Sequence, residues 1–323
     1  MDNVSFSKFI LDNAGLTEAA RQRLARAAEL PQWLLDEGDA MVPSTVQLQL
    51  WELIEHRLDN PDIALHIGLL NTLGRFGLHD YLFSTAPTLG EGLALAEQHA
   101  DLITTNIGFA VSGESEDEAN ADFRLLSGQG RGRQLATQFS LAAVVARARF
   151  ATGREVCPVR IRFRQRAPRR HRHFTDIFGT RCIDFGAPTD QITFRTADLA
   201  LPLRTADPAL AEVLRRCALT LPPPRRLDST WSSQVQHALT AMLGDGPVPI
   251  DRVARHLLTS RRSLQRRLAG EGTTWTRELD RARSTLVEHR SPADDTQEAL
   301  ARRVGYSDAG TLRRAQRRWD TGA

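Results

Sequence analysis

The chain has 323 residues, of which 41% are hydrophobic and 25% charged, and its formal net charge is +3. This length exceeds that of most single domains, and the composition excludes a disordered or fibrous protein, so we expect a globular protein of two domains. No run of 18 apolar residues is present, and the N-terminus lacks the basic and apolar regions of a secretion signal, so we predict neither a membrane span nor a leader.

The first 220 residues contain several amphipathic helical patterns. Thr17 and Thr88 stand where N-caps are expected, because each precedes a run with apolar residues at helical spacing. We therefore predict helices over residues 17–30, 43–58, 88–104 and 133–150. The last of these should end at Gly153, and its inner stripe is predicted to be Leu135, Phe139, Ala143, Ala146 and Phe150.

Strand patterns occupy much of the remaining N-terminal sequence. Residues 107–126 alternate around an acidic turn, which predicts a hairpin. Three shorter strands are predicted over residues 158–165, 182–185 and 191–194. Because strands and helices do not alternate regularly, we expect an α+β domain.

The stretch LPPPRRLD, residues 221–228, marks a domain boundary, because three consecutive prolines favour an extended segment without backbone hydrogen bonds. Beyond it the pattern is entirely helical, and the charge changes. From residue 251 to the end there are 16 arginines and 10 acidic residues, a net charge of +6. We predict an N-terminal domain over 1–220, a proline-rich linker over 221–228 and a basic C-terminal domain over 229–323 that binds nucleic acid.

The C-terminal domain contains an internal repeat. VARHLLTSRRSLQRRL begins at Val253, and LARRVGYSDAGTLRRAQ begins at Leu300 with one extra residue before its second leucine. Each copy reads as a short helix, a tight turn and an arginine-bearing helix, which is the helix-turn-helix arrangement that places its second helix in the DNA major groove. Six helices are predicted, over residues 232–243, 250–257, 260–269, 274–289, 296–304 and 308–319.

The stretch SRRSLQRRL shows how one such helix could read DNA. Ser260 suits an N-cap, and Leu264 and Leu268, four residues apart, should face inward. The outer faces then carry Arg261, Arg262, Gln265 and Arg266. Arginine and glutamine side chains match guanine and adenine edges, so this face is predicted to contact bases.

The alternative interpretation is a solvated basic face on an ordinary surface helix. Two copies with the same turn, joined by one helix, favour DNA reading instead. The joining helix over 274–289 would span about 24 Å, which with its flanking loops could set two recognition helices roughly 34 Å apart, one turn of the duplex.

At these residues the chain resembles the AraC/XylS family of transcription regulators. The resemblance covers the whole C-terminal segment, including LQRRLAGEGTTWTRELDRAR and ARRVGYSDAGTLRRAQRRW. DYLFSTAPTLGEGL and PVRIRFRQRAPRRHRHFTDIFGTRCIDFGAPTDQITFRTADLALPL resemble, more loosely, the arabinose-binding-like effector domain of one subgroup. The resemblance implies a sequence-specific regulator with an N-terminal small-molecule sensor domain, which binds double-stranded DNA as a homodimer and contacts RNA polymerase.

The resemblance also assigns base contacts residue by residue. In the first unit they fall on Arg262, Gln265 and Arg266. In the second unit they fall on Ala309, Gly310, Thr311 and Arg314, and the predicted DNA-binding set adds Arg261 and Arg313. Since three of the four positions in the second unit carry small side chains, we expect it to read sequence less strictly than the first.

Three departures from the family pattern affect this expectation. Leu258 occupies the place of a turn glycine, where a left-handed conformation is costly for leucine. Gln316 replaces a buried aromatic residue, and the chain stops soon after Trp319, where family members continue. The second unit is therefore expected to be marginal, or ordered only on DNA.

Four arginines alternate along the strand predicted over 158–165 and just beyond it: Arg160, Arg162, Arg164 and Arg166. A period of two places them on one face of the strand. A solvated face is the favoured interpretation, and an anion or DNA-backbone site is the alternative, in its sharper form a site for a carboxylate effector.

No motif for catalysis, a metal or a cofactor is found. His171 and His173 lack acidic or cysteine partners at useful spacing, so no metal site is predicted, and GQGRG at 128–132 indicates a turn rather than a phosphate loop. The three scattered cysteines favour reduced thiols and a cytoplasmic protein. A DNA-binding regulator without enzymatic activity or cofactor is therefore favoured over an enzyme or scaffold whose basic helical tail serves only for localisation.

Overall fold

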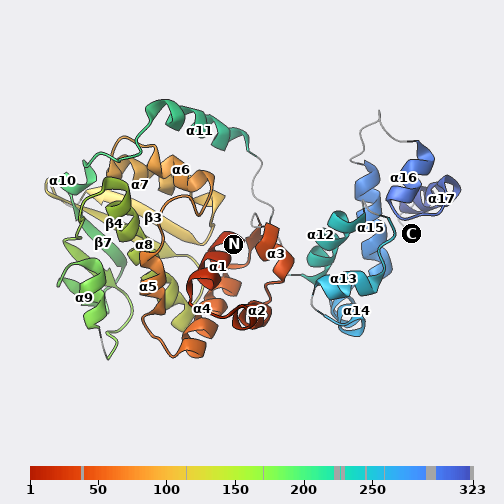
Figure 1. Cartoon of the computed structure of the whole chain (residues 1–323), viewed down its shortest axis with the longest axis horizontal. Helices are drawn as coiled ribbons and strands as arrows, with labels where there is room; N and C mark the ends of the chain where they lie inside the picture. The colour runs from red at the N-terminus through yellow and green to blue at the C-terminus, as the bar shows by residue number, and fades with distance from the viewer. Residues whose placement is uncertain are drawn as a thin grey trace. The chain divides into compact units, whose positions relative to one another are not determined.

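The structure is a computed structural model, and it describes every residue except 38–39, 114, 170, 222–225, 227–229, 244–245, 258, 289–295 and 321–323. The chain forms two compact units, Met1–Arg226 and Leu227–Ala323 (Figure 1). The first unit combines helices with a sheet, and the described part of the second is helical, which confirms the predicted fold class. Most of the predicted linker, Leu258 and the last three residues lie outside the described part.

The N-terminal unit is organised around a sheet whose strand order is β3-β4-β7-β5-β6. The strands are β3 (Ile107–Gly113), β4 (Glu118–Leu125), β7 (Asp190–Arg195), β5 (Arg160–Phe163) and β6 (Ile183–Phe185). All neighbours are antiparallel except β5 and β6. Phe123, Ile161 and Ile192 are buried, since alternate side chains face the covering helices. The predicted hairpin is confirmed, and β5 is shorter than predicted, so Arg164 and Arg166 lie beyond it.

The helices of this unit include those predicted and several that were not. They are α1 (Val4–Asn13), α2 (Glu18–Ala27), α3 (Gln32–Glu37), α4 (Ser44–Leu58), α5 (Ile63–Leu69), α6 (Leu78–Ser84), α7 (Leu89–Gln98), α8 (Gly130–Thr152), α9 (Arg172–Phe178), α10 (Thr196–Leu199) and α11 (Pro208–Thr220). A short 3-10 turn, Ala100–Leu102, follows α7, and the small strands β1 (Asp2–Asn3) and β2 (Met41–Val42) pair with each other. Thr17 and Thr88 are N-caps, because their side chains accept hydrogen bonds from the backbone of Ala20 and Glu91.

Helix α8 is the centre of the N-terminal unit, where it contacts α4, α5 and the strands β4 and β7. It begins at Gly130 rather than at residue 133, so the end of GQGRG forms its first turn, and it ends at the predicted Gly153 cap. The inner stripe is buried except at Phe150, which is 51% exposed although Ala151 beside it is buried.

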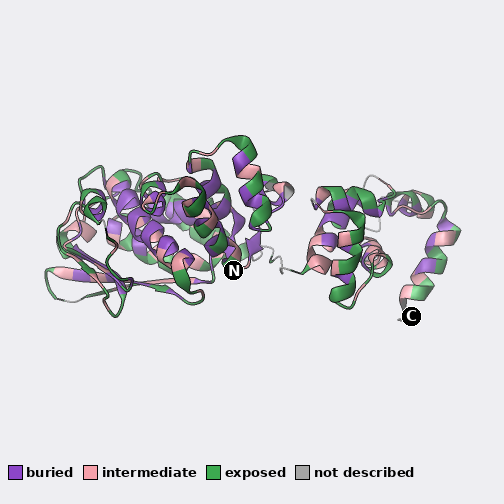
Figure 2. Ribbon diagram, turned by 90° about the horizontal axis from the view of Figure 1, so that it is seen from below, coloured by how far each residue is buried: buried purple, intermediate pink, exposed green. Residues whose placement is uncertain are grey.

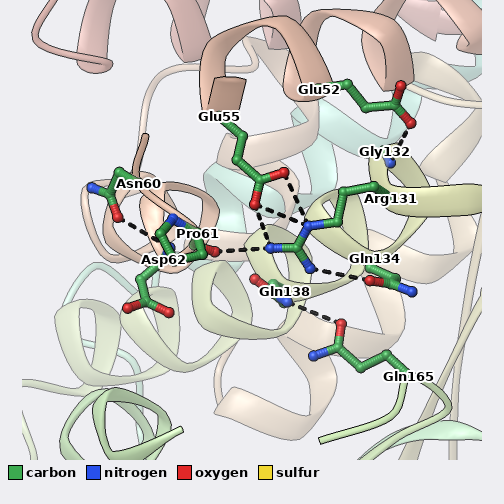
Figure 3. A network of polar contacts seen from close by, with 10 residues as sticks. All are labelled: Glu52, Glu55, Asn60, Pro61, Asp62, Arg131, Gly132, Gln134, Gln138 and Gln165. Carbon is green, nitrogen blue, oxygen red and sulfur yellow. Dashed lines mark hydrogen bonds and ion pairs between the residues drawn. The ribbon is translucent and has the colours of Figure 1, made fainter. Parts of the chain in front are cut away.

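Polar contacts fix the start of α8 against α4 (Figure 3). The carboxylate of Glu52 accepts a hydrogen bond of 2.7 Å from the backbone N–H of Gly132 and so caps the helix. Glu55 accepts two bonds from Arg131 Nε, at 2.9 and 3.0 Å, and Arg131 also donates to the carbonyl of Pro61. These contacts set the position of α8 along α4.

The described part of the C-terminal unit consists of helices whose buried and exposed residues alternate at helical spacing (Figure 2). They are α12 (Trp231–Leu243), α13 (Ile250–His256), α14 (Arg261–Gly270), α15 (Trp275–Glu288), α16 (Gln297–Arg303) and α17 (Ala309–Asp320). All six predicted helices are confirmed, with ends that differ by at most one residue. The helix-turn-helix pairs are α13–α14 and α16–α17, and α15 joins them.

The contact between α5 and α8 depends on Gly68. A Cβ atom added at this glycine would lie 2.7 Å from the carbonyl oxygen of Phe139 and 2.8 Å from the Cβ of Ala142. Because the obstacle includes backbone, we expect Gly68→Ala to lower the free energy of unfolding by about 1–3 kcal/mol despite the better helix propensity of alanine. Chemical denaturation of the full chain measures the change. Gly113→Ala is the control, because its added Cβ meets no atom within 4 Å, and a loss as large for both variants would contradict this account.

Candidate functional site

Helix α14 presents the basic face expected of a recognition helix. Ser260 accepts a hydrogen bond of 3.1 Å from the backbone of Ser263 and caps the helix, and Leu264 and Leu268 are completely buried. Those two leucines hold the inner face, which leaves the outer face to polar side chains. The outer face carries the exposed residues Arg261, Arg262, Gln265 and Arg266.

The outward side chains of α14 differ in how they are engaged. Nη1 of Arg261 lies 3.8 Å from Oδ2 of Asp251, an exposed ion pair that connects α14 to α13. Arg262, Gln265 and Arg266 have no hydrogen-bond or ion-pair partner within the described residues. Their donors are therefore available to another molecule.

Helix α17 begins with different chemistry, because Asp308 rather than a serine caps it. Its carboxylate accepts a bond of 2.7 Å from the backbone N–H of Thr311. This bond, followed by those from the hydroxyls of Ser307 and Thr311, lowers the pKa of Asp308 to about 2. A negative charge therefore stands at the N-terminal end of α17 at neutral pH, where α14 has the uncharged Ser260.

The residues of α17 that are predicted to contact bases differ in their exposure and in their hydrogen-bond partners. Ala309 is 6% exposed, so its methyl group lies in the core of the unit and we leave it out of the proposed contact set. The hydroxyl of Thr311 donates to Asp308 and accepts a bond of 3.0 Å from Arg314. Gly310, Arg313 and Arg314 are exposed.

The second helix-turn-helix unit, α16–α17, has its own hydrophobic core. Leu300, Ala301, Val304 and Leu312 are buried, and Leu286, Val287, Tyr306 and Trp319 pack against them. Gln316 is half-buried. Aromatic packing is thus supplied by Tyr306 and Trp319 rather than by position 316.

The first end of the joining helix α15 is fixed by Glu278. This residue is 3% exposed, and its carboxylate accepts bonds of 2.6 Å from the hydroxyl of Thr273 and from the side-chain amide of Gln236 on α12. A buried carboxylate is tolerated only with such partners. The contact holds α15 against the core of the first unit.

The other end of α15 is fixed by Arg283, which hydrogen-bonds to the turn of the second helix-turn-helix unit. Its Nε donates to the carbonyl of Val304 at 2.9 Å, and its guanidinium lies 4.3 Å from the centre of the Tyr306 ring. Gly305 lies in this turn with φ +79°, a conformation that favours glycine. The corresponding residue of the first unit, Leu258, lies outside the described part. Arg318 of α17 adds a bond of 2.8 Å to Asp280 of α15.

The N-terminal unit holds a cavity of about 120 Å³ between α6, α7, α8 and the strands β3 and β4. Its walls are mainly apolar, and the aromatic residues among them are Phe6, Phe76, Phe83, Phe109, Phe123 and Phe139. Six polar residues also line it: Asn71, His79, Glu97, Thr104, Ser140 and Arg147. None of them was singled out from the sequence, because no local pattern connects them.

The arginines of β5 lie apart from this cavity. Arg160 and Arg162 approach Asp184 of β6 at 3.4 and 3.7 Å, and Arg162 also donates to Gln191 at 2.6 Å. Arg160 and Arg162 therefore contact the sheet surface, and the carboxylate site suggested for this arginine run stays a prediction. No group of three potential metal ligands occurs among the described residues, and no described helix is long and apolar enough to cross a bilayer.

Comparison with known proteins gives consistent matches. Residues 19–203, more than half of the chain, match the family described as the N-terminal arabinose-binding domain of AraC transcription regulators. The ornithine utilization regulator of Pseudomonas aeruginosa is 24% identical over 320 residues, which cover 98% of this chain and 93% of that protein. An uncharacterized HTH-type transcriptional regulator of Mycobacterium tuberculosis is 25% identical over 296 residues, 88% and 84% of the two chains. The crystal structure of the transcriptional regulator CdpR from Pseudomonas aeruginosa aligns with a TM-score of 0.42 and 22% identity, over 96% of this chain and 97% of that one.

We predict that Arg283→Ala loosens the second unit and spares the first. Its bonds to backbone carbonyls and its stacking on Tyr306 are worth about 2 kcal/mol together, which corresponds to roughly 30-fold faster opening. Hydrogen exchange of the full chain should accelerate by that factor in α16 and α17 and stay unchanged in α13 and α14. Arg281→Ala, an exposed position on the same helix, is the control. Equal acceleration in both units would show that Arg283 does not act locally.

Proposed function

Because the chain belongs to the family of transcription regulators that carry the N-terminal arabinose-binding domain of AraC, we propose that it binds duplex DNA at specific sequences. In this proposal it senses a small molecule through the N-terminal unit and acts on RNA polymerase as a homodimer. The observation that carries the proposal is the pair of helix-turn-helix units. Each has exposed arginines on its second helix, and one helix, α15, joins the two units.

The proposed DNA contacts fall into two groups. Arg262, Gln265 and Arg266 are exposed and uncommitted, so they are suited to forked contacts with base edges. Arg313 and Arg314 of α17 are exposed as well, but Asp308 repels phosphate nearby and engages Thr311. The first unit therefore carries most of the sequence preference in this proposal, and the second adds affinity through the DNA backbone.

The homodimer in this proposal is assigned to α11. Leu210 and Val213 are 43% and 54% exposed, and Cys217 continues the same stripe at helical spacing. Ala211 is the only buried residue of this helix. An apolar stripe with spacings of three and four residues is suited to pack against its own copy.

We expect Arg266→Ala to abolish preference for the operator, because losing a forked arginine–guanine contact typically costs about 1–3 kcal/mol at that base pair. Arg314→Ala should lower affinity and keep most of the preference. Competition between operator DNA from beside the protein's own gene and scrambled duplex, at fixed salt, measures both. If Arg314→Ala erases the preference and Arg266→Ala does not, the second unit is the specific reader.

A second expectation concerns assembly. Val213→Asp places a charge on the apolar stripe of α11 and should shift the full chain from dimer to monomer, with weaker binding to two half-sites than the wild type. Sedimentation of wild type and variant measures this. Leu219→Asp is the matched control, since Leu219 is 83% exposed but lies on the opposite side of the helix. A dimer that persists in Val213→Asp excludes α11 as the interface.

A further inference from the structure

The cavity of the N-terminal unit contains a charged pair within apolar walls. Arg147 on α8 is 8% exposed, and Asp80 on α6 is fully buried. Nη1 of Arg147 lies 2.6 Å from Oδ1 of Asp80, and the guanidinium carbon lies 4.6 Å from the centre of the Phe83 ring. The guanidinium is therefore fixed in place by an ion pair and by an aromatic face.

Asp80 is firmly held in its charged form. Its Oδ2 accepts bonds of 2.7 and 2.9 Å from the backbone of Arg75 and Phe76. Burial works to raise its pKa, but the His79 side chain, the Arg147 charge and the Phe76 N–H lower the pKa to about 2. The Arg147–Asp80 pair is therefore ionised and carries no net charge at neutral pH.

Two polar atoms around the cavity have no hydrogen-bond partner in the described part of the chain and no ion pair. They are Nη2 of Arg147 and Oδ1 of Asn71. His79 bonds through Nε2 to the carbonyl of Ala96 at 3.1 Å, and because that oxygen can only accept, the proton is on Nε2. Burial lowers the pKa of His79, and its Nδ1 lies 3.8 Å from Oδ1 of Asp80. The buried atoms without a partner are thus one charged donor and one neutral acceptor, and the exposed side chain of Glu97 also lines the cavity.

The partners of these atoms set the chemistry of a ligand. A buried guanidinium N–H forms its strongest bonds with an anionic oxygen, and arginine suits carboxylates in particular. Asp80 already neutralises the guanidinium, which favours a single carboxylate over a dianion. The walls are mainly apolar, with six phenylalanines, and the volume of about 120 Å³ is close to that of protein cavities that hold benzene.

We infer that this cavity binds a small monocarboxylic acid with an apolar body of one ring or a short branched chain, whose carboxylate accepts from Nη2 of Arg147. The inference rests on the proposed sensing function and names its ligand class. Within this assignment Arg147 recognises the acid, Asp80 positions Arg147, and the phenylalanine side chains enclose the apolar body.

The test is calorimetric titration of the full chain at pH 7 with two acid–amide pairs, benzoate with benzamide and 3-methylbutanoate with its primary amide. Each pair shares its shape and differs in charge. At least one acid should bind ten or more times as tightly as its amide. Equal affinity within both pairs, or binding of none of the four probes, overturns the inference.

Two variants locate the binding. Val144→Phe fills the cavity from its half-buried wall and should remove acid binding, with Arg147 and Asp80 intact. Arg147→Gln combined with Asp80→Asn removes both charges together and should reduce the acid preference to less than twofold. Acid binding that survives Val144→Phe, or a preference that survives the double variant, contradicts the assignment. Circular dichroism confirms folding of each variant, and the wild-type probe series decides the matter if the double variant does not fold.

A gel shift with operator DNA on the same proteins separates this inference from the proposed function. If the wild type binds operator DNA but shows no preference for the acids over the amides, only the ligand class is overturned. If the wild type shows no sequence-specific DNA binding, the regulator proposal is overturned, whatever the titrations give.

Discussion

The arrangement of the two helix-turn-helix units depends on how α15 is fixed at its two ends. Buried Glu278 accepts hydrogen bonds from Gln236 of α12 and from Thr273, which follows α14, and Arg283 donates to the carbonyl of Val304 in the second helix-turn-helix unit. Because α15 has 14 residues, it spans about 21 Å and sets the separation of the two helix-turn-helix units. If either end were loose, the two recognition helices could not be held in register with successive major grooves.

The two readers share a fold but differ at the first turn of the recognition helix. Ser260 caps α14 without charge, whereas ionised Asp308 caps α17 and engages Thr311. An anion at a helix N-terminus stabilises the helix, but it repels phosphates of approaching DNA. In the proposed DNA complex, Asp308 therefore stabilises α17 and lowers the affinity of the second helix-turn-helix unit for phosphate.

Local signals made much of the fold predictable. The caps Thr17, Thr88 and Ser260, together with helical spacing, predicted some of the helices, and the repeat predicted the two helix-turn-helix units and the exposed face of α14. The sequence did not reveal the Arg147–Asp80 pair, because its members are far apart in the chain and meet only through packing of α6 against α8. It misplaced Phe150, because helical spacing alone does not show which residues of a helix the neighbouring elements cover.

The N-terminal cavity and the two helix-turn-helix units lie in separate compact units, so each can be tested by itself. The central claim is that α15 fixes the separation of the two recognition helices. Hydroxyl-radical footprinting of the full chain on its bound DNA tests it most directly. The account predicts two protected segments on one side of the duplex, about 10 base pairs apart, with the stronger sequence dependence in the segment read by α14. A single protected segment, or two segments whose separation varies from site to site, would contradict it.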